Sequence, residues 1–114
     1  MQLKQIVEKL GLTQATNLRI PEVEVETGYV SDLLSNVMGQ AAENYIWVTM
    51  QGHPNIAAIA SLLSLACIVV AGDAGIDPET IERANENEVL IFKTAHSSFE
   101  ITGKLYALGV KGHE

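Results

Sequence analysis

The sequence has few basic residues, one cysteine and few aromatic residues. Seven Lys and Arg side chains stand against 14 Asp and Glu in 114 residues, so the net charge is −7. Proteins that bind nucleic acids or anionic membrane surfaces use clustered Lys and Arg, and this balance therefore argues against both as partners. The length suits one domain of about 100–150 residues, which can bury a core without disulfide bonds.

The single cysteine, Cys67, lies in an apolar run. One cysteine cannot form an intrachain disulfide, and a thiol in such a run is typically buried and unreactive. The first residues show no basic segment followed by an apolar stretch, which is the pattern of a signal peptide. These absences predict a cytoplasmic protein.

An uncharged stretch runs from residue 44 to residue 72. A Gly-His-Pro-Asn segment at residues 52–55 divides it, and the remaining piece, residues 56–71, is shorter than the about 20 apolar residues of a membrane-spanning helix. That piece changes from Ala, Leu and Ser to β-branched residues, which predicts a buried helix followed by a buried strand. We therefore expect no membrane span.

Hydrophobic spacing predicts helices that alternate with strands. Helices are expected near residues 3–12, 31–38, 54–65, 77–87 and 97–108, and apolar runs at residues 45–50, 68–71 and 89–92 predict buried central strands. The alternation of Glu and Val at residues 22–27 predicts an edge strand with one solvated face. We expect residues 111–114 to fray. The order of elements predicts an α/β fold: a single three-layer domain over residues 1–114, with a mostly parallel β-sheet flanked by helices.

Three sequence signals mark helix starts. Ser31 is expected to cap the helix that follows it. Asp77 precedes a proline, an arrangement typical of the first helical turn. Ser97 has Glu100 three residues later, which is the pattern of a capping box.

Three glycine-containing or polar loops follow the central strands, and each precedes a predicted helix. Ligands of parallel α/β sheets bind at the carboxyl ends of the strands, where helix N-termini favour anions. Glycine also lets backbone approach a ligand closely. We expect a small anionic ligand or nucleotide at these loops, unless the glycines and caps serve only to turn the chain. The candidate ligand-binding residues are Gly52, His53, Asn55, Gly72, Asp73, His96 and Ser97.

Several motifs of catalysis are missing. The Gly103-Lys104 pair is followed by Leu105, and Ser98 stands where a P-loop has its first glycine. Neither a GxGxxG nor a GxSxG pattern is present. We therefore expect no kinase activity from this chain on its own, no catalytic residues and no bound cofactor or metal.

An alternative function follows from three side chains in different loops. His53, Asp73 and His96 could converge, and two histidines with a carboxylate can bind zinc or non-haem iron. Their spacing matches no local metal-binding motif. A metal-dependent enzyme that uses these three residues is the alternative to a non-catalytic protein.

Five segments carry a resemblance to a known family: residues 26–34, 47–56, 60–65, 68–72 and 94–108. On these segments the chain resembles the DRTGG domain family over about residues 20–110, and that family is similar to the N-terminal domain of HPr kinase/phosphorylase. Gly52 and Gly72 match glycines of the family's two loops. His53 and Pro54 stand where the family has aspartate and arginine, and Asp73 replaces a further glycine.

The resemblance implies an HPr kinase N-terminal domain-like fold and a non-catalytic role in regulation, ligand sensing or interaction with a partner protein. Domains of the family occur beside CBS domains in regulatory pyrophosphatases and in phosphotransacetylases. Small stand-alone members are encoded near iron-only hydrogenase genes in anaerobes. Some are labelled serine kinases, a label that does not fit a chain without a P-loop.

A homodimer is also expected. Hydrophobic residues make up 47% of the chain, and the predicted helix at 56–65 presents small residues that permit close approach of a neighbour. That helix could equally pack on its own sheet, and the resemblance favours pairing. We expect an interface of helices and edge elements, because the acidic segment at residues 22–26 would repel its own copy across a two-fold axis.

Overall fold

The computed structural model describes residues 1–113, which form five helices and six strands. In chain order they are α1 (Leu3–Leu10), β1 (Thr13–Gln14), β2 (Thr27–Val30), α2 (Leu34–Gln40), β3 (Ile46–Thr49), α3 (Asn55–Leu63), β4 (Cys67–Val70), α4 (Pro78–Glu86), β5 (Ile91–Lys93), α5 (Ser98–Ala107) and β6 (Lys111–Gly112). The strands form one sheet in the order β1-β5-β4-β3-β2-β6. Within the described residues β1 pairs antiparallel with β5, and the other neighbours are parallel.

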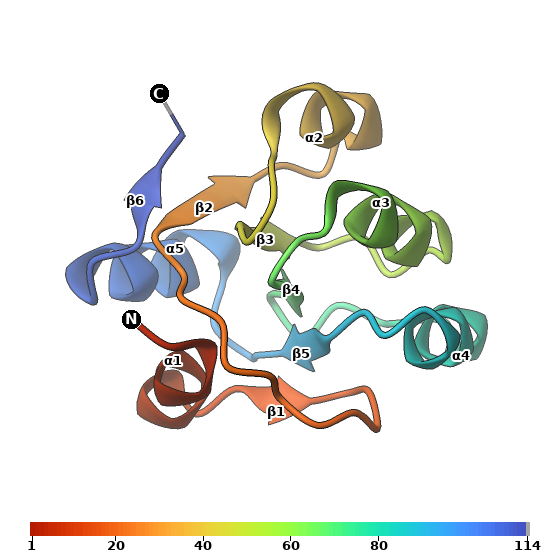
Figure 1. The fold of residues 1–114 in the computed structure, drawn as a ribbon, viewed down its shortest axis with the longest axis horizontal. Helices are drawn as coiled ribbons and strands as arrows, with labels where there is room; N and C mark the ends of the chain where they lie inside the picture. Colours follow the sequence, from red (N-terminus) through yellow and green to blue (C-terminus); the bar gives the residue numbers. More distant parts are fainter. Residues whose placement is uncertain (114) are drawn as a thin grey trace.

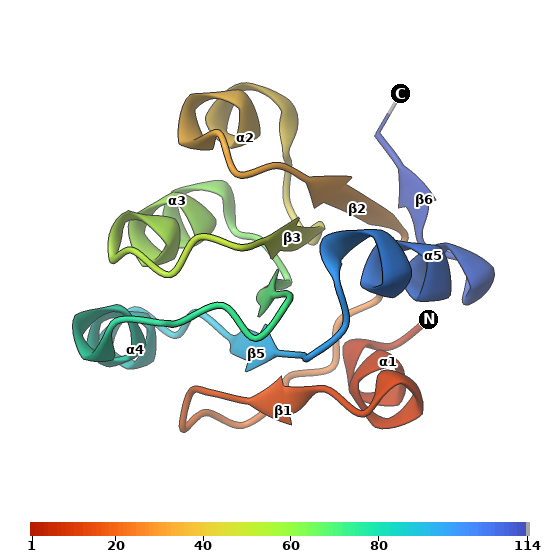
Figure 2. The ribbon, with the colours of Figure 1, turned by 180° about the vertical axis from the view of Figure 1, so that it is seen from behind.

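Helices cover both faces of the sheet, which confirms the predicted three-layer α/β fold. Figures 1 and 2 show α1 and α5 on one face and α2, α3 and α4 on the other. Side chains of β3 alternate between these layers because successive strand residues point to opposite faces. Ile46 and Val48 pack in one core cluster with Ile101 of α5, and Trp47 packs in the other with Ile56 of α3.

The central strands lie where the apolar runs predict them. Every residue of β3 and β4 is buried, since helices cover both sides of the sheet. Cys67 in β4 is buried as predicted, and this burial raises the pKa of its thiol well above the usual value. No helix in residues 1–113 is long and apolar enough to span a bilayer; α5, the longest, has ten residues.

The segment at residues 22–27 is not the predicted edge strand. Its alternation does describe burial, because Val25 is 1% exposed while Glu22, Glu24 and Glu26 are exposed. The strand in the sheet begins only at Thr27, and it lies between β3 and β6 rather than at an edge.

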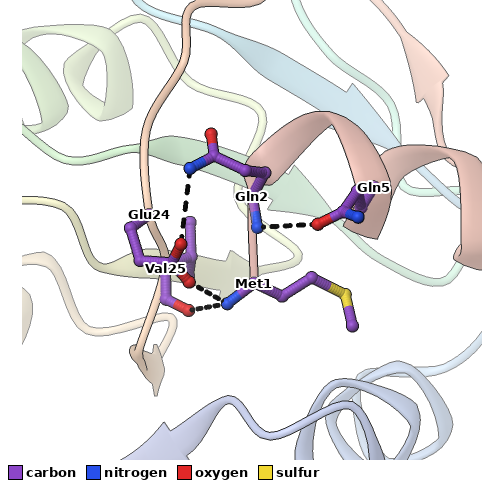
Figure 3. Close-up of polar contacts among 5 residues, drawn as sticks. All are labelled: Met1, Gln2, Gln5, Glu24 and Val25. Carbon is purple, nitrogen blue, oxygen red and sulfur yellow. Dashed lines mark hydrogen bonds and ion pairs between the residues drawn. The ribbon is translucent and has the colours of Figure 1, made fainter.

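Residues 23–25 lie against the N-terminus instead. The backbone N–H of Leu3 donates to the carbonyl of Val23 (3.0 Å), and that of Val25 donates to Met1 (2.9 Å). Figure 3 shows the Met1 ammonium between the Glu24 carboxylate and the Val25 carbonyl, its two acceptors. The hydrogen bond from this ammonium holds the pKa of Glu24 below its usual value.

Two further expectations need correction. Lys111 and Gly112 do not fray: they form β6 and extend the parallel sheet beside β2. Residue 114 of the predicted frayed tail lies outside the described residues. Ser31 is not the N-cap of α2, because the helix begins at Leu34 with Leu33 at the cap, while the Ser31 hydroxyl accepts the Leu33 N–H (3.1 Å).

Candidate functional site

The predicted ligand loops leave one edge of the sheet. They are residues 50–54 after β3, residues 71–77 after β4 and residues 94–97 after β5. These strands are adjacent and parallel, so their carboxyl ends lie side by side. We call this edge, with its three loops, the carboxyl edge.

The second and third loops are joined through their backbones. The N–H of Gly72 donates to the carbonyl of His96 (2.7 Å), and the N–H of Asp73 donates to Thr94 (3.1 Å). Both Gly72 (φ +68°) and Asp73 (φ +53°) are in the left-handed region, which turns the second loop toward the third. The structure therefore brings Gly72, Asp73 and His96 together, whereas the convergence considered from the sequence was that of His53, Asp73 and His96.

A cleft of about 330 Å³ lies between these loops and the end of α1. We call it the Lys93 cleft. Its lining combines backbone, apolar side chains and three groups that can carry charge: Lys93, Asp73 and His96. Within residues 1–113 the ion pairs are Met1–Glu24 and Arg83–Glu79, so the exposed Lys93 ammonium is not part of one.

The start of α5 adds donors next to this cleft. The Ser97 side chain caps the helix by accepting the N–H of Glu100 (3.2 Å), which confirms the predicted cap. The first turn of a helix has N–H groups without intrahelical acceptors, and these favour an anion. Phe99 in the same turn is 85% exposed. The α5 start thus presents polar donors and an aromatic ring together.

The first loop packs on the second at a different point. A Cβ on Gly52 would lie 1.9 Å from the Gly75 carbonyl oxygen, so the missing side chain allows two loops to touch. The Gly52 carbonyl then accepts the N–H of Asp77 (3.1 Å) and the hydroxyl of Thr80 (2.6 Å). This glycine has a packing role that the sequence did not distinguish from ligand approach.

His53 and Asn55 form a separate pair. The His53 ring nitrogen Nδ1 accepts the backbone N–H of Asn55 (3.1 Å), which closes the start of α3. Both side chains are exposed, and neither lines the Lys93 cleft. The seven candidate residues therefore separate. Asp73 and His96 line the Lys93 cleft, and Gly72 and Ser97 are their chain neighbours. His53 and Asn55 lie at the start of α3, and Gly52 packs on Gly75.

This division overturns the convergence that the metal-enzyme alternative needs. In residues 1–113 no three His, Cys, Asp or Glu side chains lie close enough to hold a metal ion. The physical reason is the left-handed turn at Gly72 and Asp73, which turns Asp73 toward His96, while the first loop is bonded further along at Asp77. His53, Asp73 and His96 do not form a three-ligand site.

Two polar residues of the edge escaped the sequence analysis. The Asp32 carboxylate accepts the Thr49 hydroxyl and the Met50 N–H, both at 2.7 Å, and so fixes the end of β3. From the sequence, Asp32 is expected in the first turn of a helix. Its hydrogen-bond partner Thr49 is 17 residues away, so no local pattern indicates their contact. Lys93 is the last residue of β5 and is exposed, whereas the two residues before it are buried. A lysine directly after an apolar run was the signal that could have marked it as a candidate for anion binding.

Comparison with known proteins shows the fold. No protein-family model matches the chain, and no curated protein matches it. A solved structure is similar with a TM-score of 0.67 at 21% sequence identity: the CBS and DRTGG domains of the regulatory region of Clostridium perfringens pyrophosphatase, complexed with its activator diadenosine tetraphosphate. The similarity covers 89% of this chain and 44% of that chain, so this chain spans less than half of it. It supports a DRTGG-like fold.

Proposed function

We propose that this protein is a non-catalytic regulatory domain that senses a small anionic ligand, a nucleotide in particular, at the carboxyl edge of its sheet. The observation that carries the proposal is the Gly72–His96 backbone hydrogen bond of 2.7 Å, which joins two loops around the Lys93 cleft. The ligand would contact Gly72, Asp73, His96 and Ser97, with Lys93 as its cation. The similar pyrophosphatase region is complexed with a nucleotide activator, diadenosine tetraphosphate, which supports this class of ligand.

The charges of the cleft restrict how a nucleotide would bind. Lys93 and the α5 start favour phosphate, whereas Asp73 lines the same cleft and repels it. A magnesium–nucleotide complex carries less negative charge than the free nucleotide, and its cation suits an oxygen ligand such as Asp73. The exposed ring of Phe99 could stack on the base. We therefore expect the magnesium complex to bind more tightly than the free nucleotide.

Isothermal titration calorimetry tests the proposal with ATP, diadenosine tetraphosphate and adenosine, each with and without magnesium. The phosphate-bearing ligands should bind and adenosine should not. Lys93→Gln should weaken binding about tenfold or more, as expected when a charged hydrogen bond is lost. Lys4→Gln, at the other end of α1, is the matched control and should bind as the wild type does. Equal affinities of the two variants would contradict the proposal.

The non-catalytic part has its own test. Phosphorus NMR should show intact ATP and diadenosine tetraphosphate after long incubation with the protein and magnesium. The support for this part is the sequence, which contains neither a P-loop nor a GxSxG motif. Turnover that copurifies with the protein and disappears in Lys93→Gln would refute this part.

We also propose that the protein forms a homodimer through α2 and α3. Neither helix contains a charged residue, although the chain carries a net charge of −7. Their outer surface and flanks expose Leu33 (64%), Met38 (49%) and Leu62 (68%). A two-fold interface places the same surface on both sides, so an uncharged surface avoids repulsion. Sedimentation equilibrium should give twice 12.3 kDa; a constant monomer mass at micromolar concentration would leave a different partner protein as the occupant.

A further inference from the structure

A second cleft, far along the sheet from β5, lies beside β2, β6 and α5. Its volume is about 260 Å³, and Figures 1 and 2 both show α5 next to these two strands. We call it the α5 cleft. Its lining contains none of the residues of the Lys93 cleft, so it is a distinct feature of the surface.

Two paired glycines line the α5 cleft. Gly28 of β2 is the register partner of Gly112 of β6, and both line the α5 cleft. Gly28 also pairs with Ile46, whose side chain belongs to the core layer that α5 covers. The Val110 side chain fills part of the space beside Gly28, since a Cβ on Gly28 would lie 3.3 Å from Val110 Cγ1. A Cβ on Gly112 would meet no atom of residues 1–113 within 4 Å, so the open part of the cleft lies at Gly112.

The walls of the α5 cleft are mainly apolar. Four apolar residues line it: Val30 of β2, Val48 of β3, Leu105 of α5 and Val110, which directly precedes β6. Thr102 also lines it, and its hydroxyl oxygen is the one buried side-chain N or O atom without a hydrogen-bond partner in residues 1–113. A buried unpartnered hydroxyl is unfavourable, and an added acceptor would remove that cost.

A cation stands at the rim of the α5 cleft. Lys111 Nζ lies 3.8 Å from the centroid of the Tyr106 ring and 3.3 Å from the Tyr106 carbonyl oxygen. The ion pairs formed within residues 1–113 do not include Lys111. An apolar space with one fixed ammonium at its mouth suits a molecule that is apolar at one end and anionic at the other.

We propose that the α5 cleft binds a small carboxylic acid with an aliphatic body. The hydrocarbon chain would lie against Val30, Val48 and Leu105, and the carboxylate would pair with Lys111. The volume of about 260 Å³ is slightly below the roughly 300–1,000 Å³ of known ligand pockets, so a medium-chain acid fits better than a long one. This site is independent of the nucleotide proposed at the carboxyl edge.

Three probes separate the contributions: octanoate, octan-1-ol and acetate, each below the concentration at which it aggregates. In amide NMR titrations octanoate should shift the signals of Gly28, Val110 and Gly112. Octan-1-ol should bind at least tenfold more weakly because it lacks the charge, and acetate should cause no saturable shift because it lacks the chain. Equal affinities of octanoate and octan-1-ol, or shifts only elsewhere, would overturn the proposal.

Two pairs of variants sharpen the test. Lys111→Gln should abolish the preference for octanoate over octan-1-ol, whereas Lys104→Gln, an exposed lysine of α5 outside the cleft, should keep it. Gly112→Leu fills the open space and should abolish octanoate binding. Gly39→Leu, at an equally open position on α2, should bind octanoate like the wild type. Octanoate binding that survives Gly112→Leu would refute the proposal, whatever happens at the carboxyl edge.

Discussion

Replacing Gly52 with alanine tests how the carboxyl edge is held together. The added Cβ would lie 1.9 Å from the Gly75 carbonyl oxygen and 2.9 Å from Ile76 Cα. Both are backbone atoms, so no flexible side chain can move aside. The second loop must shift away from the first, and this shift strains the two hydrogen bonds that the Gly52 carbonyl accepts from Asp77 and Thr80.

The size of the effect follows from these contacts. Overpacking by one methyl group in a tight site costs about 1–3 kcal/mol. Each of the two hydrogen bonds contributes about 0.5–1.5 kcal/mol. Together Gly52→Ala should destabilise the fold by about 2–6 kcal/mol, a large share of the about 5–15 kcal/mol of a typical domain.

Urea unfolding followed by Trp47 fluorescence measures this loss. In a thermal unfolding experiment the same loss should lower the melting temperature by at least about 8 °C, at about 4 °C per kcal/mol. Gly103→Ala is the matched control: it makes the same change in α5, where a Cβ meets no atom within 4 Å, and should stabilise by about 0.5–1 kcal/mol. Equal stability of Gly52→Ala and the wild type would refute the described packing of the two loops.

Three further outcomes are expected. Thr102→Val keeps the shape of the side chain but removes the unpartnered hydroxyl, so urea unfolding should show a gain of about 1 kcal/mol; a loss would mean that the hydroxyl has a partner. Cys67 should react with a thiol reagent only after unfolding, because burial raises the pKa of its thiol; fast labelling of the folded protein would contradict this. The pKa of Glu24 is lowered by the Met1 ammonium, so its stabilising effect is complete above the unfolded pKa and is lost as the pH falls through the folded pKa. The stability difference between wild type and Glu24→Gln should therefore shrink between about pH 6 and about pH 3, as urea unfolding can show.

The layers of the fold could be predicted because burial leaves a strong pattern. Strands covered on both faces are mainly apolar, and β3, β4 and β5 follow that pattern, except for Thr49 and Lys93 at the carboxyl ends of β3 and β5. The edge strands could not be predicted in this way. Both β1 and β6 are two residues long, and their backbone pairing leaves no hydrophobic pattern in the sequence.

The alternating acidic segment shows how a correct pattern can give a wrong element. Alternation reports that one face is buried and the other solvated, and Val25 and its glutamate neighbours do so. It does not report what the backbone pairs with. Here the partner is the N-terminus at Met1 and Leu3, rather than a strand of the sheet.

The candidate site was predicted in part for a related reason. Adjacent parallel strands bring their loops to one edge, and the loops that carry Gly72, Asp73 and His96 do lie together there. By the same rule the first loop was expected to contribute to the ligand site as much as the other two. The sequence could not show that Gly52 packs on Gly75, since glycine serves close packing and ligand approach equally well.

The most direct test of ligand sensing at the carboxyl edge is an amide NMR titration of the wild-type protein with ATP and magnesium. The account predicts saturable shifts at Gly72, Asp73, His96 and Ser97, around the Lys93 cleft, and unchanged signals at Gly28 and Gly112 of the α5 cleft. Addition of a chelator should reduce the affinity. A spectrum that stays unchanged at millimolar ATP, or shifts confined to residues away from the carboxyl edge, would contradict the account.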